Sequence, residues 1–470
     1  MKTYKNIIYC LLSFAVVNLF SSCKKFLTVT PSSQSVNPTT MRDFQEILNN
    51  DSLSRGNFFL LDLMSDDATI SDANYEQGNT FYRRVATWAP EIWNPAQIDF
   101  MYNYTYGRIL QMNVILSRVD NAIIDEINTP RNRNLVISQA LINRASYYLQ
   151  LVNTYGPAYD PATSASDPGV PLVLSPDANT LPSRASVEAV YTSVIADLRR
   201  AIANTSLPAK GIDIVHPGKA AGFGLLARAY LYRGDYVSAN AYADSALRQE
   251  NRLLNLTTQN YFPQQLQDIA FNPEILLGRA SIDDGFFSNY RTTFTIGQSL
   301  LDSLGGTFSA DRRFNTRFSF GRFSNRTYNG NTTNQFQMVF DASIGVPEMM
   351  LIRAECLARR GNFQEAGSLI DRLRSNRIPA NALGTRNYTS ANILNYVLGE
   401  RRRELCFKGG LRLFDLKRLN REPALRVNLI KRNLFGTTEW ATLSAGSPRY
   451  LLPFSSGVLA ANPNITQNPR

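Results

Sequence analysis

Residues 223–247 read FGLLARAYLYRGDYVSANAYADSAL, and the spacing of this stretch predicts two helices packed against each other across a short turn. The pattern is that of a tetratricopeptide repeat. Small alanines stand where the two helices would cross most closely, a glycine stands at the turn, and aromatic residues fill the space between the helices. The matching positions are Phe223, Leu226, Ala227, Tyr230, Gly234, Tyr236, Ala239, Ala246 and Leu247.

A second stretch, residues 350–366, carries the same pattern. Its matching positions are Met350, Ala354, Leu357, Gly361, Phe363 and Ala366. Ala227 and Ala354 lie far more than one repeat of about 34 residues apart, so the repeats are not contiguous. We therefore predict a scaffold of helix pairs that is interrupted by long insertions.

Further amphipathic helices are predicted upstream of the first repeat. Apolar residues recur with helical spacing over residues 102–119 and 135–155. Ser186 is a candidate N-cap for a helix with an apolar stripe at Val187, Val190, Tyr191, Val194, Ile195, Leu198 and Ile202. Residues 161–182 between the last two helices are rich in Pro, Ser and Asp, which predicts a loop too long for a simple connector.

The largest insertion spans about residues 282–345. Residues 286–340 hold ten Phe, two Tyr and six Arg but only two acidic residues. Turn signals and short alternating apolar runs within it predict small strands. Its aromatic rings have two interpretations: a ligand-binding face, or a hydrophobic cluster that packs the insertion onto the helices.

The N-terminus has the pattern of an export signal. Lys2 and Lys5 precede an apolar run over residues 7–20, and Ser21 and Ser22 lead directly to Cys23. The run is too short to span a bilayer but suits a signal peptide. A cysteine just after the cleavage site is where bacterial lipoproteins are acylated; the alternative is an ordinary secretory signal. We predict a signal peptide over 1–22, an acylated Cys23, a tether over 23–40, and one helical domain over 41–470.

Composition excludes several classes of function. The 470-residue chain has a formal net charge of +11, but its Lys and Arg do not form a stripe interleaved with aromatic residues, so we predict no nucleic-acid partner. His216 is the only histidine, and it precedes Pro217-Gly218, where a turn is expected. A histidine-rich metal site is therefore excluded, and a histidine-dependent catalytic triad would rest on this one residue. Neither a metal nor a cofactor is predicted. Cys356 and Cys406 lie on apolar helix flanks, which favours two buried thiols over a disulfide.

The chain resembles the SusD/RagB family of outer-membrane nutrient-uptake lipoproteins of Bacteroidetes. The most specific part is ERRRELCFKG at 400–409, followed by Arg412 and by FDLKR at 414–418. Other segments match in the family's order along essentially the whole chain: CKKFL at 23–27, PSSQ at 31–34, Tyr106 with Ile109 and Asn113, Arg184 with Ser186-Val187 and Val190-Tyr191, Asp197-Leu198, VPEMMLIRAE at 346–355, Leu452-Pro453-Phe454, Asn462-Pro463 and Gln467-Asn468-Pro469. Lys408 and Tyr102 depart from the family's usual Glu and Trp.

The resemblance implies a mainly α fold, in which tetratricopeptide-like helix pairs form a right-handed superhelical scaffold with long loop insertions and a few short strands. It also implies lipid anchoring at the outer membrane on the cell-surface side, although Lys24 and Lys25 replace the acids that often follow the lipidated cysteine. The implied partner is a SusC-like TonB-dependent transporter, and the implied ligand is a glycan. The ERRREL run is expected to form ion pairs with neighbouring helices rather than to contact ligand.

Ligand contacts are expected from loops, because family members build their binding surface there. The loop between the first two helices supplies Asp72, Asn74, Tyr75, Arg83, Trp88 and Trp93 as candidates, and the insertion supplies Asp283, Tyr290 and Arg322. Aromatic rings suit the C–H faces of sugars, and the polar groups would fix hydroxyls. For each tryptophan, burial in the core is an equally weighted alternative.

Three other functions compete with glycan capture. The same scaffold would suit a peptide or another anionic nutrient, because arginine forks match carboxylates. A glycosidase would use acids such as Asp66, Asp67, Asp283 or Asp284, but adjacent carboxylates point in different directions and nothing sets the separation that hydrolysis requires. A scaffold that binds only its transporter is the third. We predict a non-catalytic binding protein.

Overall fold

The computed structural model describes residues 38–56, 58–77, 80–123, 127–177, 180–213, 215–258, 272–281, 294–305, 310–313, 318–320, 326–328, 340–433 and 436–470. Cys23, the signal peptide and most of the tether therefore lie outside the described residues, as does most of the insertion predicted at 282–345.

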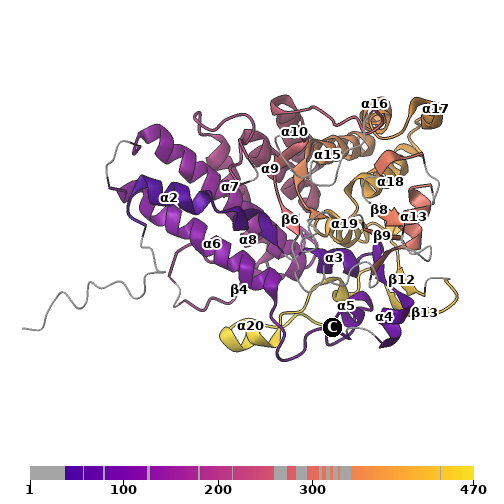
Figure 1. Cartoon of the computed structure of the whole chain (residues 1–470), viewed down its shortest axis with the longest axis horizontal. Helices are drawn as coiled ribbons and strands as arrows, with labels where there is room; N and C mark the ends of the chain where they lie inside the picture. The colour runs from indigo at the N-terminus through magenta and orange to yellow at the C-terminus, as the bar shows by residue number, and fades with distance from the viewer. Residues whose placement is uncertain are drawn as a thin grey trace, which may run out of the picture.

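A succession of long helices forms the body of the molecule. Neighbours in the chain pack against each other from α6 to α10, and α15 continues the succession by packing on α10 (Figure 1). The helices are α6 Phe100–Arg118, α7 Pro130–Tyr155, α8 Val187–Ile202, α9 Lys219–Arg233, α10 Tyr236–Gln249, α15 Val346–Arg359, α16 Phe363–Ser375, α18 Ile393–Leu405 and α19 Leu411–Leu419. The mainly α fold predicted from the sequence is confirmed.

Helix α8 shows how the sequence produces these elements. Ser186 caps it as predicted, because its side chain accepts a hydrogen bond from the Ala189 backbone N–H at 3.1 Å. The residues at helical spacing are buried on the face toward α7 and α9. Arg199 and Arg200 lie in the last turn, where positive charge complements the helix dipole.

The two predicted repeats are helix pairs, α9 with α10 and α15 with α16. Gly234 and Gly361 have φ angles of 77° and 83° at the turns, a conformation that costs glycine little. Ala227 and Ala354 are completely buried, since only a small side chain fits at a close helix crossing.

Short strands join segments that are distant in sequence. The central sheet has three strands in the order β1–β6–β10, with β1 parallel and β10 antiparallel to β6. The other sheets are antiparallel pairs: β11 with β5, β12 with β13, β2 with β7, β3 with β4 and β8 with β9. The bounds are β1 Arg55–Gly56, β2 Ala68–Ile70, β3 Pro168–Pro171, β4 Arg184–Ser186, β5 Ile275–Leu277, β6 Ala280–Ser281, β7 Phe294–Ile296, β8 Phe318–Phe320, β9 Arg326–Tyr328, β10 Phe340–Asp341, β11 Ile344–Gly345, β12 Leu429–Arg432 and β13 Glu439–Leu443.

Shorter helices fill the spaces between these elements. They are α2 Met41–Leu48, η2 Asp51–Ser54, α3 Phe59–Met64, α4 Asp72–Gln77, α5 Thr80–Ala86, η3 Val119–Asn121, α13 Gln298–Ser303, α17 Ala380–Leu383, η4 Pro423–Leu425, η5 Pro448–Tyr450 and α20 Ser456–Ala461. Figure 1 shows α3, α4 and α5 gathered with β12 and β13 at the lower right edge, so the N- and C-terminal parts of the chain build this edge together.

The ERRREL run holds the C-terminal helices together by ion pairs, as predicted. Arg401 donates its Nε to Asp415 at 2.7 Å, and Arg418 contacts the same Asp415 and makes a two-pronged contact with Glu355. Glu400 and Glu404 both accept from Nη1 of Arg313, which is completely buried. The run therefore has a structural role.

Cys356 and Cys406 are both buried and are not joined in a disulfide, which confirms the prediction of two buried thiols. Burial raises the pKa of Cys356 to about 12, so this side chain stays a thiol at neutral pH. Within the described part of the chain, no helix combines the length and the apolar character needed to cross a bilayer.

Candidate functional site

A stacked aromatic pair lies at the edge built by α4, α5 and β13. The rings of Tyr75 and Trp440 lie 4.1 Å apart between centroids and only 3° from parallel. Both rings are half-buried, so each keeps part of its surface outside the core. Aromatic surface of this kind suits the apolar face of a sugar ring.

Polar side chains surround this pair. Arg83 on α5 donates from Nη1 to the Tyr75 carbonyl at 3.0 Å, and its guanidinium lies 6.0 Å from the Tyr75 ring centroid. Asn74 donates to the Ser71 hydroxyl at 2.9 Å, which fixes the first turn of α4. Asp72 begins the same helix and is half-buried. The structure thus brings four of the predicted ligand contacts into one region: Asp72, Asn74, Tyr75 and Arg83.

Trp88 does not belong to this surface, which corrects the prediction that it contacts ligand. Its side chain is 1% exposed, and its Nε1 donates to the Met64 carbonyl at 2.8 Å. The backbone of Trp88 has a φ angle of 52°, a left-handed conformation that turns the chain at the end of α5 and directs the ring inward. The Nζ of Lys431 lies 5.4 Å from its ring centroid. The core interpretation therefore holds for Trp88.

Trp93 is half-buried and stands apart from the stacked pair. Its Nε1 donates to the Pro453 carbonyl at 2.7 Å, and its ring is tilted against that of Phe81 at 5.3 Å. The indole N–H thus binds the C-terminal segment, although the side chain remains partly exposed.

Two of the four acids considered for catalysis, Asp66 and Asp67, have arginine partners. Asp66 receives two hydrogen bonds from Arg412, at 2.7 and 2.9 Å, and Asp67 receives one from Nε of Arg402 at 2.9 Å. The two guanidinium groups lower the pKa of Asp66 despite its burial, so this carboxylate stays ionised and paired. His216 lies in the expected turn, with Nδ1 2.7 Å from Asp213 Oδ2.

Some predicted residues cannot be placed. Cys23, Asp283, Asp284, Tyr290 and Arg322 lie outside the described residues. Among the residues that are described, no cluster of three or more His, Cys, Asp or Glu side chains is arranged to hold a metal ion.

Sequence reasoning missed Trp440. It lies in β13, and it stacks on Tyr75, which is 365 residues away in the sequence. The only sequence signal was its rarity, since the chain has three tryptophans.

Family models match nearly the whole chain. One that describes starch-binding proteins associating with the outer membrane matches residues 25–231, and one for the SusD family matches residues 241–470. No curated protein sequence matches the chain significantly.

Solved structures of similar fold include proteins of Bacteroides species. A putative sugar-binding protein of Bacteroides vulgatus is 21% identical and has a TM-score of 0.74, over 93% of this chain and 99% of that one. A SusD superfamily protein of Bacteroides thetaiotaomicron is 20% identical, with a TM-score of 0.69 over 92% and 100% of the two chains. Surface glycan-binding protein A of Bacteroides uniformis is 16% identical, with a TM-score of 0.69 over 91% and 99%. Identities this low show a shared fold. The two family matches, which together span most of the chain, establish that this chain belongs to the SusD family, which is described as starch-binding and associated with the outer membrane.

Proposed function

We propose that this protein captures a glycan at the outer membrane and passes it unaltered to a SusC-like TonB-dependent transporter. Membership of the SusD family supports the glycan class of ligand. The observation that carries the assignment of a site is the parallel stack of Tyr75 on Trp440, with Asp72, Asn74 and Arg83 nearby.

This region has the composition that sugar binding requires. Ring surface provides apolar contact area, and a few polar groups beside it select the orientation of hydroxyls. Of the other residues predicted from sequence, Trp93 keeps some accessible ring surface and belongs to the proposal, whereas Asp283, Tyr290 and Arg322 remain proposals from sequence alone.

A binding role without catalysis is supported by the acids of this edge. Asp66 and Asp67 are engaged by Arg402 and Arg412, so neither is placed to act as a free general acid or base. Turnover of any oligosaccharide by the purified protein would contradict this part of the proposal.

The test is a glycan array followed by calorimetric titration of the glycans that bind. We expect Trp440→Ala and Tyr75→Ala each to weaken binding at least tenfold, because each removes one ring of the stack. Tyr104→Ala is the matched control, since Tyr104 is an aromatic residue 52% exposed on α6 and outside this edge. Undiminished affinity in both site variants, or an equal loss in the control, would reject the site.

Anchoring and the transporter require separate experiments. Labelled fatty acid should be incorporated into the wild-type protein and not into Cys23→Ala. A β-barrel transporter should co-purify with the wild-type protein from outer membranes. Recovery of the protein without lipid and without any barrel would contradict the proposed role in uptake.

A further inference from the structure

Two buried arginines lack a carboxylate partner, and both line the same cavity. Nine arginines of the described chain are less than one-tenth exposed: Arg108, Arg144, Arg228, Arg279, Arg313, Arg374, Arg377, Arg401 and Arg418. Seven of them form ion pairs with Asp or Glu. Within the described part of the chain, Arg108 and Arg279 do not, and each is 8% exposed.

The cavity lies between α6, α7 and the strands β5 and β11. It encloses about 30 Å³ and has an opening to the surface. On this measure a water molecule needs about 10–15 Å³, so the space has room for about two to three water-sized groups, such as the oxygens of a small oxyanion. Among the described residues, its lining contains four cationic side chains, Arg108, Arg228, Arg279 and Lys408, and no acidic one. We call it the arginine pocket.

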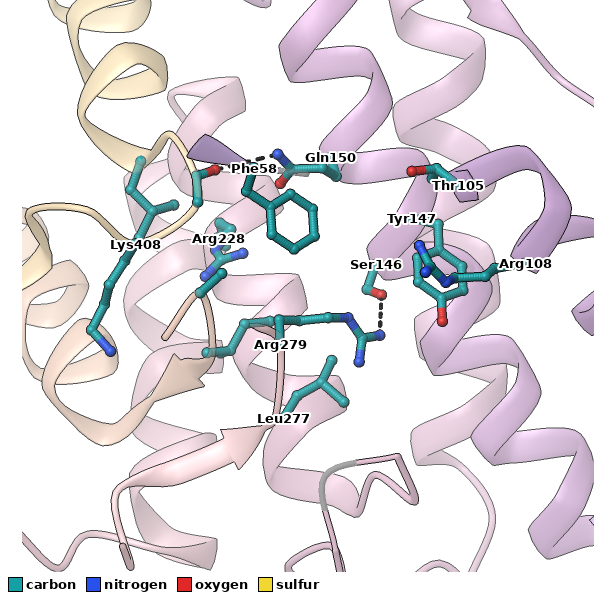
Figure 2. A pocket seen from close by; sticks show the side chains of 14 residues that line it. Phe58, Thr105, Arg108, Ser146, Tyr147, Gln150, Arg228, Leu277, Arg279 and Lys408 are labelled. Carbon is teal, nitrogen blue, oxygen red and sulfur yellow. Dashed lines mark hydrogen bonds between the residues drawn. The ribbon is translucent and has the colours of Figure 1, made fainter. Parts of the chain in front are cut away.

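Arg279 is held in place by neutral groups only. Its Nη1 donates to the Gly278 carbonyl at 2.8 Å, and its Nη2 donates to Asn143 Oδ1 at 2.8 Å and to Ser146 Oγ at 2.7 Å. Figure 2 shows this side chain running across the pocket toward Ser146. These contacts fix the guanidinium but do not balance its charge.

Arg108 approaches from the other side of Tyr147. Only its Nε has a protein acceptor in the described chain, the Ser52 carbonyl at 2.7 Å, so neither Nη group has one there, and the side chain lines the pocket. Figure 2 shows its guanidinium beside the Tyr147 ring, and the Arg279 guanidinium lies 5.1 Å from the centroid of that ring. Burial lowers the pKa of both arginines, and in each case another arginine nearby lowers the pKa further.

Hydroxyl groups of the lining do not compensate this charge. Thr105, Ser146 and Tyr147 donate their protons to the backbone carbonyls of Met101, Asn143 and Leu53. Phe58, Leu277 and Ile344 contribute apolar surface to the same cavity. An uncompensated charge in such surroundings is destabilising, and a counter-charge placed there interacts more strongly than in water.

We propose that the arginine pocket binds one small oxyanion, namely a carboxylate or a phosphate- or sulfate-type group. Planar guanidinium forks recognise such groups through paired, charge-assisted hydrogen bonds. The anion is either free in solution or the acidic group of a larger nutrient, and the shared chemistry is what the pocket selects. This site is separate from the Tyr75–Trp440 pair, so it stands or falls independently of the glycan proposal.

The test is thermal unfolding and calorimetric titration of the full-length mature protein at constant ionic strength. Phosphate, sulfate, acetate and glucuronate are compared with chloride, and glucose serves as the neutral counterpart of glucuronate. We expect at least one oxyanion to raise the melting temperature beyond chloride and glucose. Glucuronate alone would identify an acidic nutrient as the source, whereas phosphate or sulfate would identify a free ion.

Substitutions of lining residues test whether the oxyanion binds in the arginine pocket. Arg279→Met and Arg108→Met should each weaken oxyanion binding tenfold or more, and Lys408→Glu, which adds a carboxylate to the lining, should do the same. Arg84→Met is the matched control: Arg84 is half-buried, hydrogen-bonds to Asn94 and does not line the pocket. Its binding should equal that of the wild type.

A direct measurement covers the case in which a variant fails to fold. Wild-type crystals soaked in selenate should show anomalous density between Arg108 and Arg279. The proposal is overturned by equal stabilisation in chloride and in every oxyanion, by undiminished binding in the pocket variants, or by density only at surface lysines.

Discussion

The C-terminal helices and the arginine pocket both bury guanidinium groups, but they balance the charge differently. Around α18 and α19, Arg313 contacts Asp311, Glu400 and Glu404, and Arg377 contacts Glu404. We call this group the ion-pair network. In the pocket, Arg108 and Arg279 form hydrogen bonds only to neutral oxygens within the described chain.

This difference separates two reasons for burying an arginine. In the ion-pair network each charge has its counter-charge within the chain, so the arginines and acids fix how the helices pack. In the pocket the chain pre-positions positive charge and leaves the counter-charge to come from elsewhere. The same residue type therefore indicates architecture in one region and binding in the other, and the partner distinguishes them.

The largest effect is expected from breaking the ion-pair network. Glu404→Gln removes the charge shared by Arg313 and Arg377, which lie 2.8 and 3.1 Å away and are almost completely buried. Removing one partner of a buried pair typically costs about 3–5 kcal/mol of the free energy of unfolding. Urea denaturation of variant and wild type measures the loss. A change below about 1 kcal/mol would show that the remaining acids suffice.

A buried acid without a cation provides the opposite case. Asp99 is completely buried; it accepts hydrogen bonds from Tyr155 Oη at 2.7 Å and the Tyr102 N–H at 3.0 Å. Burial raises its pKa to about 6, against about 3.9 in an unfolded chain. Between these values the folded chain holds a proton that the unfolded chain has lost, so this group lowers stability as pH rises from about 4 to 6.

Asp99→Asn should remove that pH dependence. Asparagine keeps the N-cap of α6 through its single Oδ1, and its Nδ2 can donate to Tyr155 Oη, which reverses the direction of that hydrogen bond. At about 1.4 kcal/mol per pKa unit, the variant should be more stable than the wild type by about 3 kcal/mol at pH 7 and by much less at pH 4. Unfolding free energies of both proteins at the two pH values provide the measurement. An equal difference at both would mean that Asp99 does not titrate in this window.

In anion-free buffer, Arg279→Met should cost less than the matched substitution Arg377→Met. Loss of Arg377 leaves Glu274 and Glu404 with one cation fewer, whereas loss of Arg279 leaves only neutral acceptors such as Asn143. Unsatisfied neutral groups cost about 1–3 kcal/mol, and relief of an uncompensated charge offsets part of this. Denaturation of the two variants in parallel compares their free energies of unfolding. A larger loss of stability for Arg279→Met would mean that the role of Arg279 is structural.

The sequence predicted the helix pairs and the ion-pairing helix of the scaffold well. Alanine and glycine at Ala227, Gly234, Ala354 and Gly361 were sufficient to place both helix pairs, because helical spacing is a local property. The ERRREL run was correctly assigned to ion pairing for a similar reason: such a charge pattern on a helix requires partners nearby.

The candidate sites were less predictable because they depend on contacts between distant segments. Trp88 lies two residues before Pro90, where a loop was expected, yet a left-handed turn places its ring in the core. Trp440 gave no periodic signal, and its stack with Tyr75 depends on the fold. Arg279 looked like any other arginine, because the absence of a carboxylate near it is a property of tertiary structure.

The smallest effect is expected at an exposed ion pair that resembles those of the network in distance only. Arg353 lies 2.7 Å from Glu365, but the two side chains are 26% and 49% exposed. Water screens the pair, and Arg353 also contacts Asp244 at 2.6 Å. Glu365→Gln should therefore change the free energy of unfolding by about 0–1 kcal/mol, and added salt should reduce the change. Urea denaturation at low and high salt tests this. A loss comparable with that of Glu404→Gln would mean that contact distance, and not burial, sets the strength of these pairs. The burial of Arg108 and Arg279 without a carboxylate partner would then no longer indicate a binding role.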